Sequence, residues 1–201
     1  MNCDSITSMA RPKKISDQRL LDAAAVSISR LGPGFTLADV AREARVAVGT
    51  VAQRFGSKHG LLVAMTKGAI DGMRDGFRRA VEGIDPVEAP VHALVQAYVP
   101  LDDSATAANN LAQLAFDLAD DELRGLMAEF YAVMEAEVAA LLERASLAGA
   151  PPAPVAARIL TAIADGTAIH WSARPQGGLC ERLRDDLTAV VSGWRATTAR
   201  R

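Results

Sequence analysis

The fold is decided by residues 36–62, TLADVAREARVAVGTVAQRFGSKHGLL. Apolar residues recur at three- and four-residue steps within residues 37–44 and again within residues 51–55, which is the spacing of one helix face. Gly56 can end the second of these helices, and Ser57 can cap a third one. The stretch therefore predicts a helix-turn-helix that is followed at once by another helix.

The start of this motif carries its own signals. Thr36 is a good N-cap, because its hydroxyl can accept a hydrogen bond from a free backbone N–H. Asp39 stands three residues later and can complete a variant of the capping box, while Phe35 can pack onto Val40 as a hydrophobic staple. These residues predict that the first motif helix begins directly after Thr36.

The second half of the motif, GTVAQRFGSKHGLL (residues 49–62), resembles the helix-turn-helix signature of the tetracycline-repressor (TetR) family. The matching residues are Gly49, Thr50, Phe55, Ser57, Lys58, Leu61 and Leu62. Residues 19–35, RLLDAAAVSISRLGPGF, resemble the family's first helix and its Gly-Phe exit. The resemblance covers roughly residues 15–65. It implies a dimeric, ligand-responsive regulator, most readily a repressor, whose second motif helix enters the DNA major groove of a palindromic operator.

Three residues depart from the family pattern. Ala52 stands where Tyr is usual, so a large side chain that touches DNA is missing. Arg45 stands where Gly is usual, which predicts a left-handed backbone conformation that a Cβ atom disfavours. Ala47 replaces a common Ser, so the recognition helix lacks a side-chain cap worth about 1 kcal/mol. These departures leave the fold in place and bear on the DNA contacts.

Composition and charge agree with an all-α protein of two parts. Half of the 201 residues are apolar and alanine is frequent, which favours helices. Lys and Arg exceed Asp and Glu by nine to five in residues 1–66, whereas acids exceed bases by nineteen to thirteen in the remainder. A basic first part and an acidic second part suit a DNA-binding domain joined to one that avoids DNA. We divide the chain into a basic-ended tail (1–14), a helix-turn-helix domain (15–62), and an effector-binding and dimerisation domain (63–201).

Helices are expected to fill both domains. The first should begin after Ser16 and end at Leu31, with Leu21, Ala24, Ala25 and Ile28 facing inward. A long helix should start at Ser57 and reach beyond Phe77, joining the two domains. The remaining helices are predicted at about 87–99, 104–119, 121–148, 154–173 and 179–198, between breaks rich in Gly, Pro and Asp.

Other features bear on location. Cys3 and Cys180 lie too far apart in the sequence to indicate a disulfide framework or a metal site, and no stretch is long and apolar enough to cross a membrane. The N-terminus lacks the basic start and apolar core of a signal peptide. We therefore expect a cytoplasmic protein. The basic end of the tail (Arg11, Lys13, Lys14) is equally consistent with a solvated segment and with an arm that meets DNA.

For DNA, the candidate residues lie at helix starts and on the recognition helix. They are Thr36, Val48, Gly49, Thr50, Gln53, Arg54 and Lys58. Free N–H groups at the start of the recognition helix suit a phosphate or a base edge. Gln53 can read adenine and Arg54 can read guanine, and either can bind phosphate instead. Arg42 and Arg45 are further candidates for phosphate contacts or plain surface charges.

The family resemblance also implies a small-molecule pocket between the later helices. Candidate effector-binding residues are Tyr98, Asn109, Gln113, Phe116, Tyr131 and His170, with Asn110, Asp117, His92 and Trp171 as further polar candidates. A buried aromatic residue with a polar tip is more often a core residue than a ligand contact, and His170 and Trp171 can equally lie at a dimer seam. The sequence does not specify the effector.

Dimerisation is expected through the last two helices, which pair with their copies in the family. The candidate interface residues are Val155, Ile159, Ile163, Leu183, Leu187, Val190, Val191 and Trp194. The alternative is that these stripes pack only within one chain. We favour a dimer because helix-turn-helix repressors read two-fold related half-sites.

No catalytic motif stands out, and we expect no enzyme activity, cofactor or metal site. The histidines at 59, 92 and 170 lack metal-ligand spacing, and the chain has no phosphate-binding loop or nucleophile elbow. The main alternative to a regulator is an all-α dimeric interaction or scaffold protein whose DNA-binding motif has decayed. A helical enzyme that binds a small molecule is the other alternative.

Overall fold

A computed structural model describes residues 15–195, and every regular element in that range is helical. The elements are α1 (Asp17–Leu31), η1 (Gly32–Gly34), α2 (Leu37–Ala44), α3 (Val48–Phe55), α4 (Lys58–Ala80), α5 (Ala89–Tyr98), η2 (Val99–Leu101), α6 (Ala107–Ala119), α7 (Asp121–Ala145), α8 (Ala153–Ala173) and α9 (Leu179–Arg195). The prediction of an all-α fold is confirmed. The N-terminal tail, with Cys3 and the basic residues 11, 13 and 14, lies outside the described residues.

The helix-turn-helix has the predicted caps. Thr36 and Asp39 form a full capping box at the start of α2. Arg45, the C-cap of α2, adopts the left-handed conformation with φ 58° and ψ 49°. Ala47 makes no side-chain cap for α3, and the Ser57 hydroxyl accepts the Gly60 N–H at 3.0 Å to start α4.

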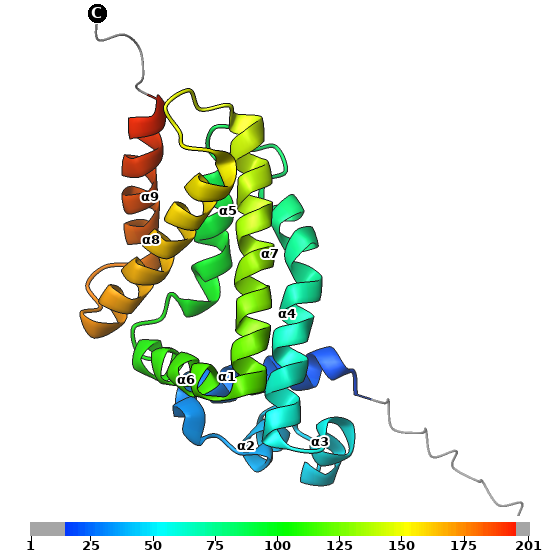
Figure 1. Cartoon of the computed structure of the whole chain (residues 1–201). Coiled ribbons are helices and arrows are strands. Elements are labelled where there is room, and N and C mark those ends of the chain that lie inside the picture. The colour runs from blue at the N-terminus through cyan, green and yellow to red at the C-terminus, as the bar shows by residue number, and fades with distance from the viewer. Residues whose placement is uncertain (1–14, 196–201) are drawn as a thin grey trace, which may run out of the picture.

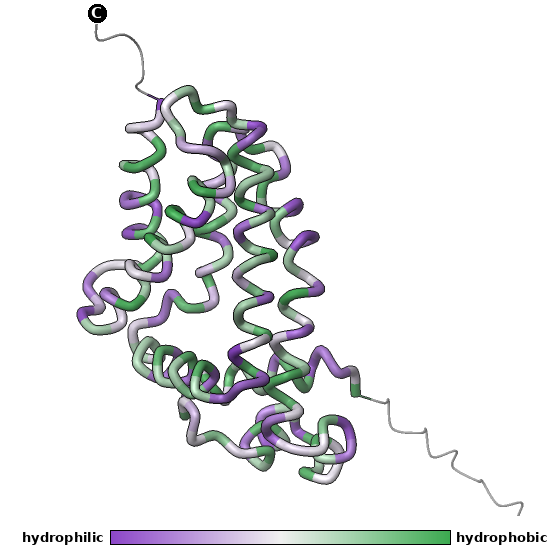
Figure 2. The backbone as a smooth tube through the Cα atoms, viewed as in Figure 1, coloured by the Kyte–Doolittle hydropathy of each residue, from purple (hydrophilic) through white to green (hydrophobic). Residues whose placement is uncertain are grey.

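Two long helices, α4 and α7, pack along each other and together span most of the length of the molecule (Figure 1). The small helices α1, α2 and α3 lie at one end of this pair, with α6 beside α1. Helices α5, α8 and α9 complete the opposite part, where α9 packs on both α5 and α8. Apolar and polar residues alternate around each helix, so apolar stripes meet between the helices (Figure 2).

Buried side chains form one core at each end. The first core holds buried residues of α1 to α3 and the first turns of α4, and it also contains Leu123 from α7. The second core contains Met73 and Phe77 of α4 together with buried residues of α5 to α9. Helix α4 therefore contributes to both cores, as its length and apolar spacing predicted.

The inward face of α1 is displaced from the expected one. Ala25 is exposed, so its predicted inward position is wrong, whereas Leu21 is half-buried and packs against the first core. The buried positions are Leu20, Ala23, Ala24, Ser27 and Ile28. The alanine run 23–25 left the register open, and Ser27 is tolerated inside because its hydroxyl donates to the Ala23 carbonyl at 2.8 Å.

The apolar stripe of α9 belongs to the monomer. Leu183, Leu187 and Val191 are buried in the second core, because α9 packs against α5 as well as α8. The prediction that these three form the interface with a second chain is therefore wrong. Residues Val190, Trp194 and Ile163 are half-buried against the same core, whereas Val155 and Ile159 on α8 are each 36% exposed.

Candidate nucleic-acid interface and ligand cavity

The recognition helix α3 presents a small, weakly polar face. Val51 is fully buried in the first core and fixes which side of α3 faces inward. Val48, Gly49 and Gln53 are exposed on the other side, while Thr50 is half-buried. A Cβ added at Gly49 would meet no other atom within 4 Å, so this glycine leaves the start of the helix open to a neighbouring molecule. These predicted DNA contacts share one accessible surface.

Arg54 lies on the same helix but is engaged within the chain. Its guanidinium forms an ion pair with Asp17, in the first turn of α1. The side chain of Arg54 is 30% exposed. A base or phosphate contact by Arg54 therefore has to replace or share this ion pair. Sequence spacing alone could not show it, since the partner lies 37 residues away.

The Lys58 side chain lies between η1 and α6, where the helix-turn-helix end contacts the rest of the molecule. Its ammonium donates to the Pro33 carbonyl and lies 4.4 Å from the centre of the Phe35 ring and 5.2 Å from that of Phe116. Burial lowers the pKa of Lys58, and the charge of Asp117 opposes that effect. This environment suits a residue that ties α4 to η1 and α6, and it differs from the solvent-facing phosphate contact that the sequence predicted.

Thr36 is exposed, but its polar groups are already paired. Its N–H and hydroxyl both donate to Asp39, at 2.9 and 2.6 Å, and the hydroxyl also accepts the Asp39 N–H. A phosphate at Thr36 would have to displace the Asp39 carboxylate. Arg42 pairs with the same carboxylate at 2.9 Å, whereas Arg45 is exposed and belongs to no ion pair formed within residues 15–195. Arg45 is therefore the base beside the turn that is most available to a phosphate.

The junction between the two cores is polar. On α6, the Asn109 amide donates to the Ser29 carbonyl at 2.9 Å, and Asn110 accepts the Ser29 hydroxyl at 3.3 Å. His59 in the first turn of α4 lies 3.2 Å from Asp120, the N-cap of α7. These polar contacts join the helix-turn-helix end to α6 and α7, beside the apolar contact that Leu123 of α7 makes with the first core.

A cavity of about 550 Å³ lies between α5, α6, α7 and α8, with Ile28 of α1 at its edge. Its walls are mostly apolar and include Met127, Phe130 and Met134 of α7. Three of the predicted effector residues, Tyr98, Gln113 and Tyr131, line it, as do Asn110 and Asp117; whether they bind an effector stays a prediction. Asn109, Phe116 and His170 do not line it. Asn109 serves the junction with α1, while Phe116 and His170 are exposed.

Two carboxylates line this cavity. The Tyr98 hydroxyl donates to Asp165 at 2.5 Å, and the Gln113 amide donates to Asp117 at 2.7 Å. Burial raises the pKa of Asp165, and the hydrogen bonds from Tyr98 and Tyr131 only partly offset it. Burial likewise raises the pKa of Asp117, with the Gln113 hydrogen bond opposing. Both acids are thus held where their charged forms lack full solvation.

Asp165 was missed by sequence reasoning, although one signal was present. It is the only acidic residue between Val155 and Trp171, and the residues from Ile159 to Ala164 before it, ILTAIA, are almost all apolar. An isolated acid on such a helix is costly unless it has hydrogen-bond donors or a ligand, so it marks a candidate site.

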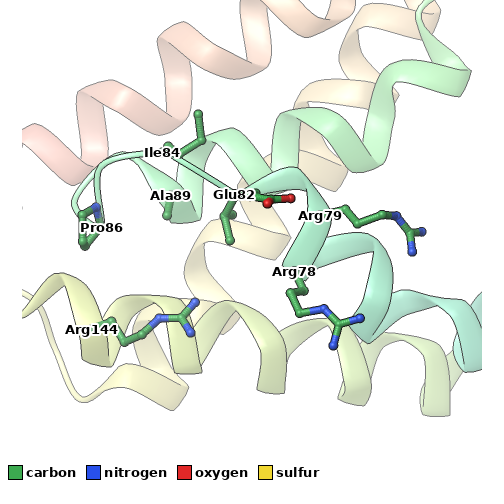
Figure 3. Close-up of a pocket in the computed structure, with 8 residues that line it drawn as sticks. Arg78, Arg79, Glu82, Ile84, Pro86, Ala89 and Arg144 are labelled. Carbon is green, nitrogen blue, oxygen red and sulfur yellow. The ribbon is translucent and has the colours of Figure 1, made fainter.

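A second cavity, of about 470 Å³, has the opposite character. It lies beyond the C-terminal end of α4 and is lined by Arg78, Arg79 and Arg144 with one acid, Glu82. Figure 3 shows Arg78 and Arg144 on neighbouring helices, with Ile84 and Pro86 on the segment that follows α4. All four charged residues are exposed, and Arg78 pairs with Asp75 at 2.9 Å, so these charges are solvated at the surface.

Three other kinds of feature bear on function: a membrane span, a metal site and a reactive thiol. No helix among residues 15–195 has the length and apolar character needed to span a bilayer. Within the same residues, no group of three His, Cys, Asp or Glu side chains is placed to hold a metal ion. Cys180 is a free thiol whose pKa burial raises to about 11, which disfavours the reactive thiolate.

Comparisons with known proteins agree with this geometry. The family described as "Bacterial regulatory proteins, tetR family" matches residues 20–65. The HTH-type transcriptional regulator HbdR from Aromatoleum sp. (strain CIB) is 32% identical over 116 residues, which cover 55% of this chain and 50% of HbdR. The chain therefore aligns with only half the length of that relative.

Solved structures extend the likeness of fold to nearly the whole chain. A transcriptional regulator from Rhodococcus sp. Rha1 superposes with a TM-score of 0.69 at 23% identity, covering 92% of this chain and 100% of that one. A TetR transcriptional regulator from Streptomyces coelicolor gives a TM-score of 0.64 at 21% identity, covering 91% and 100%. The family match thus identifies residues 20–65, with their capped helix-turn-helix, as a DNA-binding domain of the TetR family of transcriptional regulators, and the solved structures show that the helical domain behind it has the same fold.

Proposed function

We propose that this protein is a dimeric transcriptional repressor of the bacterial cytoplasm, which binds a palindromic operator through α3 and is released by a small-molecule effector. The role needs no catalytic chemistry. The observation that carries the proposal is the accessible face of α3, where Val48, Gly49 and Gln53 lie beside the open N-terminus of the helix. Such a face fits the major groove, in which a helix N-terminus meets phosphates and Gln can pair with adenine.

The dimer is supported by the outer face of α8. Val155 and Ile159, one turn apart, are each 36% exposed, although they lie on a helix that is otherwise largely apolar. Large apolar residues gathered on one helix face are typical of an interface. In our proposal this face, with the half-buried Ile163, Val190 and Trp194, contacts a second copy.

Effector release is proposed to act through α6. Gln113 and Asp117 on this helix line the cavity, while Asn109 and Asn110, one turn earlier, contact Ser29 of α1. A ligand that shifts α6 would therefore also shift α1 and the attached α2 and α3. In the proposed dimer, such a ligand favours a conformation in which the distance between the two recognition helices no longer matches the operator. Operator affinity therefore falls.

The test is a titration of labelled upstream DNA with purified protein at two salt concentrations. We expect tight binding to an inverted repeat that weakens steeply as salt rises. Gln53→Ala should weaken operator binding roughly tenfold or more and leave binding to random DNA unchanged. Gln96→Ala is the matched control, because Gln96 is an exposed glutamine on α5, away from α3.

Two results would contradict the proposal. One is binding to DNA selected from a random pool that is no tighter than binding to unselected DNA, which would favour a scaffold with a decayed motif. The other is an unchanged operator affinity for Gln53→Ala, which would remove α3 from sequence reading.

A further inference from the structure

The polar groups of the cavity between α5 and α8 accept hydrogen bonds more than they donate them. Each side-chain donor group in its lining already has an acceptor within the chain. Tyr98 and Tyr131 donate to Asp165, and Gln113 donates to Asp117. Ser172 donates to the Ala168 carbonyl at 2.9 Å, and Asn110 donates to the Thr106 hydroxyl at 3.4 Å. What remains are carboxylate oxygens, hydroxyl lone pairs and the Gln113 carbonyl oxygen.

The Gln113 oxygen is itself an unusual group. Gln113 is only 5% exposed, yet its Oε1 atom has no hydrogen-bond partner among the described residues. Leaving a buried acceptor unpaired costs about 1–3 kcal/mol. An unpaired acceptor on a residue that lines a cavity indicates that the partner is a donor brought by another molecule.

The charge of the cavity has one sign. Among residues 15–195, no Lys, Arg or His lines this cavity. Two acids, Asp117 and Asp165, do line it. Asp117 is partly compensated from outside by Lys58. No cation among the described residues compensates Asp165, because the charge that acts on it is that of Glu135, another acid. Asp165 is therefore the uncompensated charge of the cavity.

We propose that this cavity takes a hydrophobic cation, a protonated amine whose ammonium group is bound by Asp165 and whose apolar body lies against Met127, Phe130 and Met134. The inference rests on the proposed function, because it names the chemical class of the effector. An ammonium group supplies the donors that the lining lacks, and the edge-to-face pair of Phe130 and Tyr131, 5.8 Å apart, offers aromatic surface to a cation.

The protonation of Asp165 supports the same class of ligand. Burial raises the pKa of Asp165, and the negative charge of Glu135 on α7 raises it further. The hydrogen bonds from Tyr98 and Tyr131 lower this pKa but do not cancel the increase. A bound cation reverses this effect by favouring the carboxylate. Affinity for the amine should therefore be present above the raised pKa of Asp165 and fall as the pH drops through it.

The experiment uses three probes with one apolar body: 1-naphthylmethylamine, 1-naphthylmethanol and 1-naphthoic acid. Calorimetric titration into the full-length protein at neutral pH, without DNA, should show the amine binding roughly tenfold tighter than the alcohol, with the acid weakest. Asp165→Asn should abolish the preference for the amine over the alcohol. Glu82→Gln, the same chemical change in the arginine-lined cavity, should leave it intact.

The outcomes separate the class of ligand from the fold and from DNA binding. A thermal melt of Asp165→Asn confirms that the variant is folded, and retained binding of the alcohol confirms that its cavity is formed. Equal binding of amine and alcohol by the wild type, or an amine preference that survives Asp165→Asn, overturns the proposal. Because no DNA is present, failure to bind an operator would leave this result unaffected, and failure here would leave operator binding unaffected.

Discussion

Replacing Arg45 by Gly should both increase the free energy of unfolding and lower the affinity for DNA. Arg45 has φ 58° and ψ 49°, close to the ideal left-handed helix. That conformation costs an L-residue about 1–2 kcal/mol, whereas Gly adopts it freely but loses about 0.5–1 kcal/mol more backbone entropy on folding. The net gain for Arg45→Gly is therefore about 0.5–1 kcal/mol, which raises the melting temperature of a chain of this size by about 1–4 °C.

The assay combines urea unfolding with DNA titrations over a series of salt concentrations. Arg45→Ala is the matched control, because it removes the same charge and keeps the strained Cβ. Both variants should lower the salt dependence of operator binding by about one released counterion, since Arg45 is exposed beside the turn and forms no ion pair with any of residues 15–195. Only Arg45→Gly should gain stability. Equal free energies of unfolding for the two variants would refute the strain argument, and an unchanged salt slope would refute the phosphate contact.

Two further predictions concern the helix starts. Gly60→Ala should destabilise the protein by about 1–3 kcal/mol and lower operator affinity, because the new Cβ would lie 2.2 Å from the Phe55 carbonyl oxygen at the turn between α3 and α4. Gly72→Ala on the same helix meets no atom within 4 Å and should instead stabilise by about 0.5–1 kcal/mol; thermal melts of the pair that shift in the same direction would contradict this reading. Asp102 accepts the N–H groups of Leu179 and Cys180 at 2.6 and 3.2 Å and so caps α9 from a distant loop, and Asp102→Asn should cost about 1 kcal/mol at neutral pH after allowance for solvent screening. Burial raises the pKa of Asp102, but these N–H donors outweigh it and hold the pKa below its usual value, so the contribution is complete above about pH 4 and is lost as the pH falls through the lowered pKa. Urea unfolding of wild type and Asp102→Asn should therefore differ at neutral pH and converge in acid, and a constant difference would count against the charged cap.

Local signals in the sequence were sufficient for the helices and for the details of the motif. The capping box at Thr36, the left-handed Arg45 and the uncapped Ala47 all depend on residues a few positions apart. Their geometry is set by the backbone of one or two turns. A single sequence contains that information directly.

Contacts between distant residues were beyond the same reasoning. Periodicity identified the apolar stripe on α9 but not what covers it, and Leu183 and Leu187 are buried within the monomer, where α9 packs on α5 and α8, rather than against a second chain. Arg54 and Lys58 were assigned to DNA as long cations on the motif, whereas their partners Asp17 and Pro33 come from α1 and η1. The cavity was expected from the family resemblance, but Asp165 lines it only because α8 packs against α6 and α7 and forms one of its walls.

The burial of Leu123 has a consequence for how this chain can be recombined. This residue of α7 is 1% exposed and belongs to the core formed by α1, α2, α3 and the start of α4. A cut after residue 62 would leave a hole in that core and an exposed leucine on the other fragment. A chimera that transplants these helices onto another sensor must therefore supply an equivalent side chain from the recipient's own long helix, so the two halves can be exchanged only as a matched set.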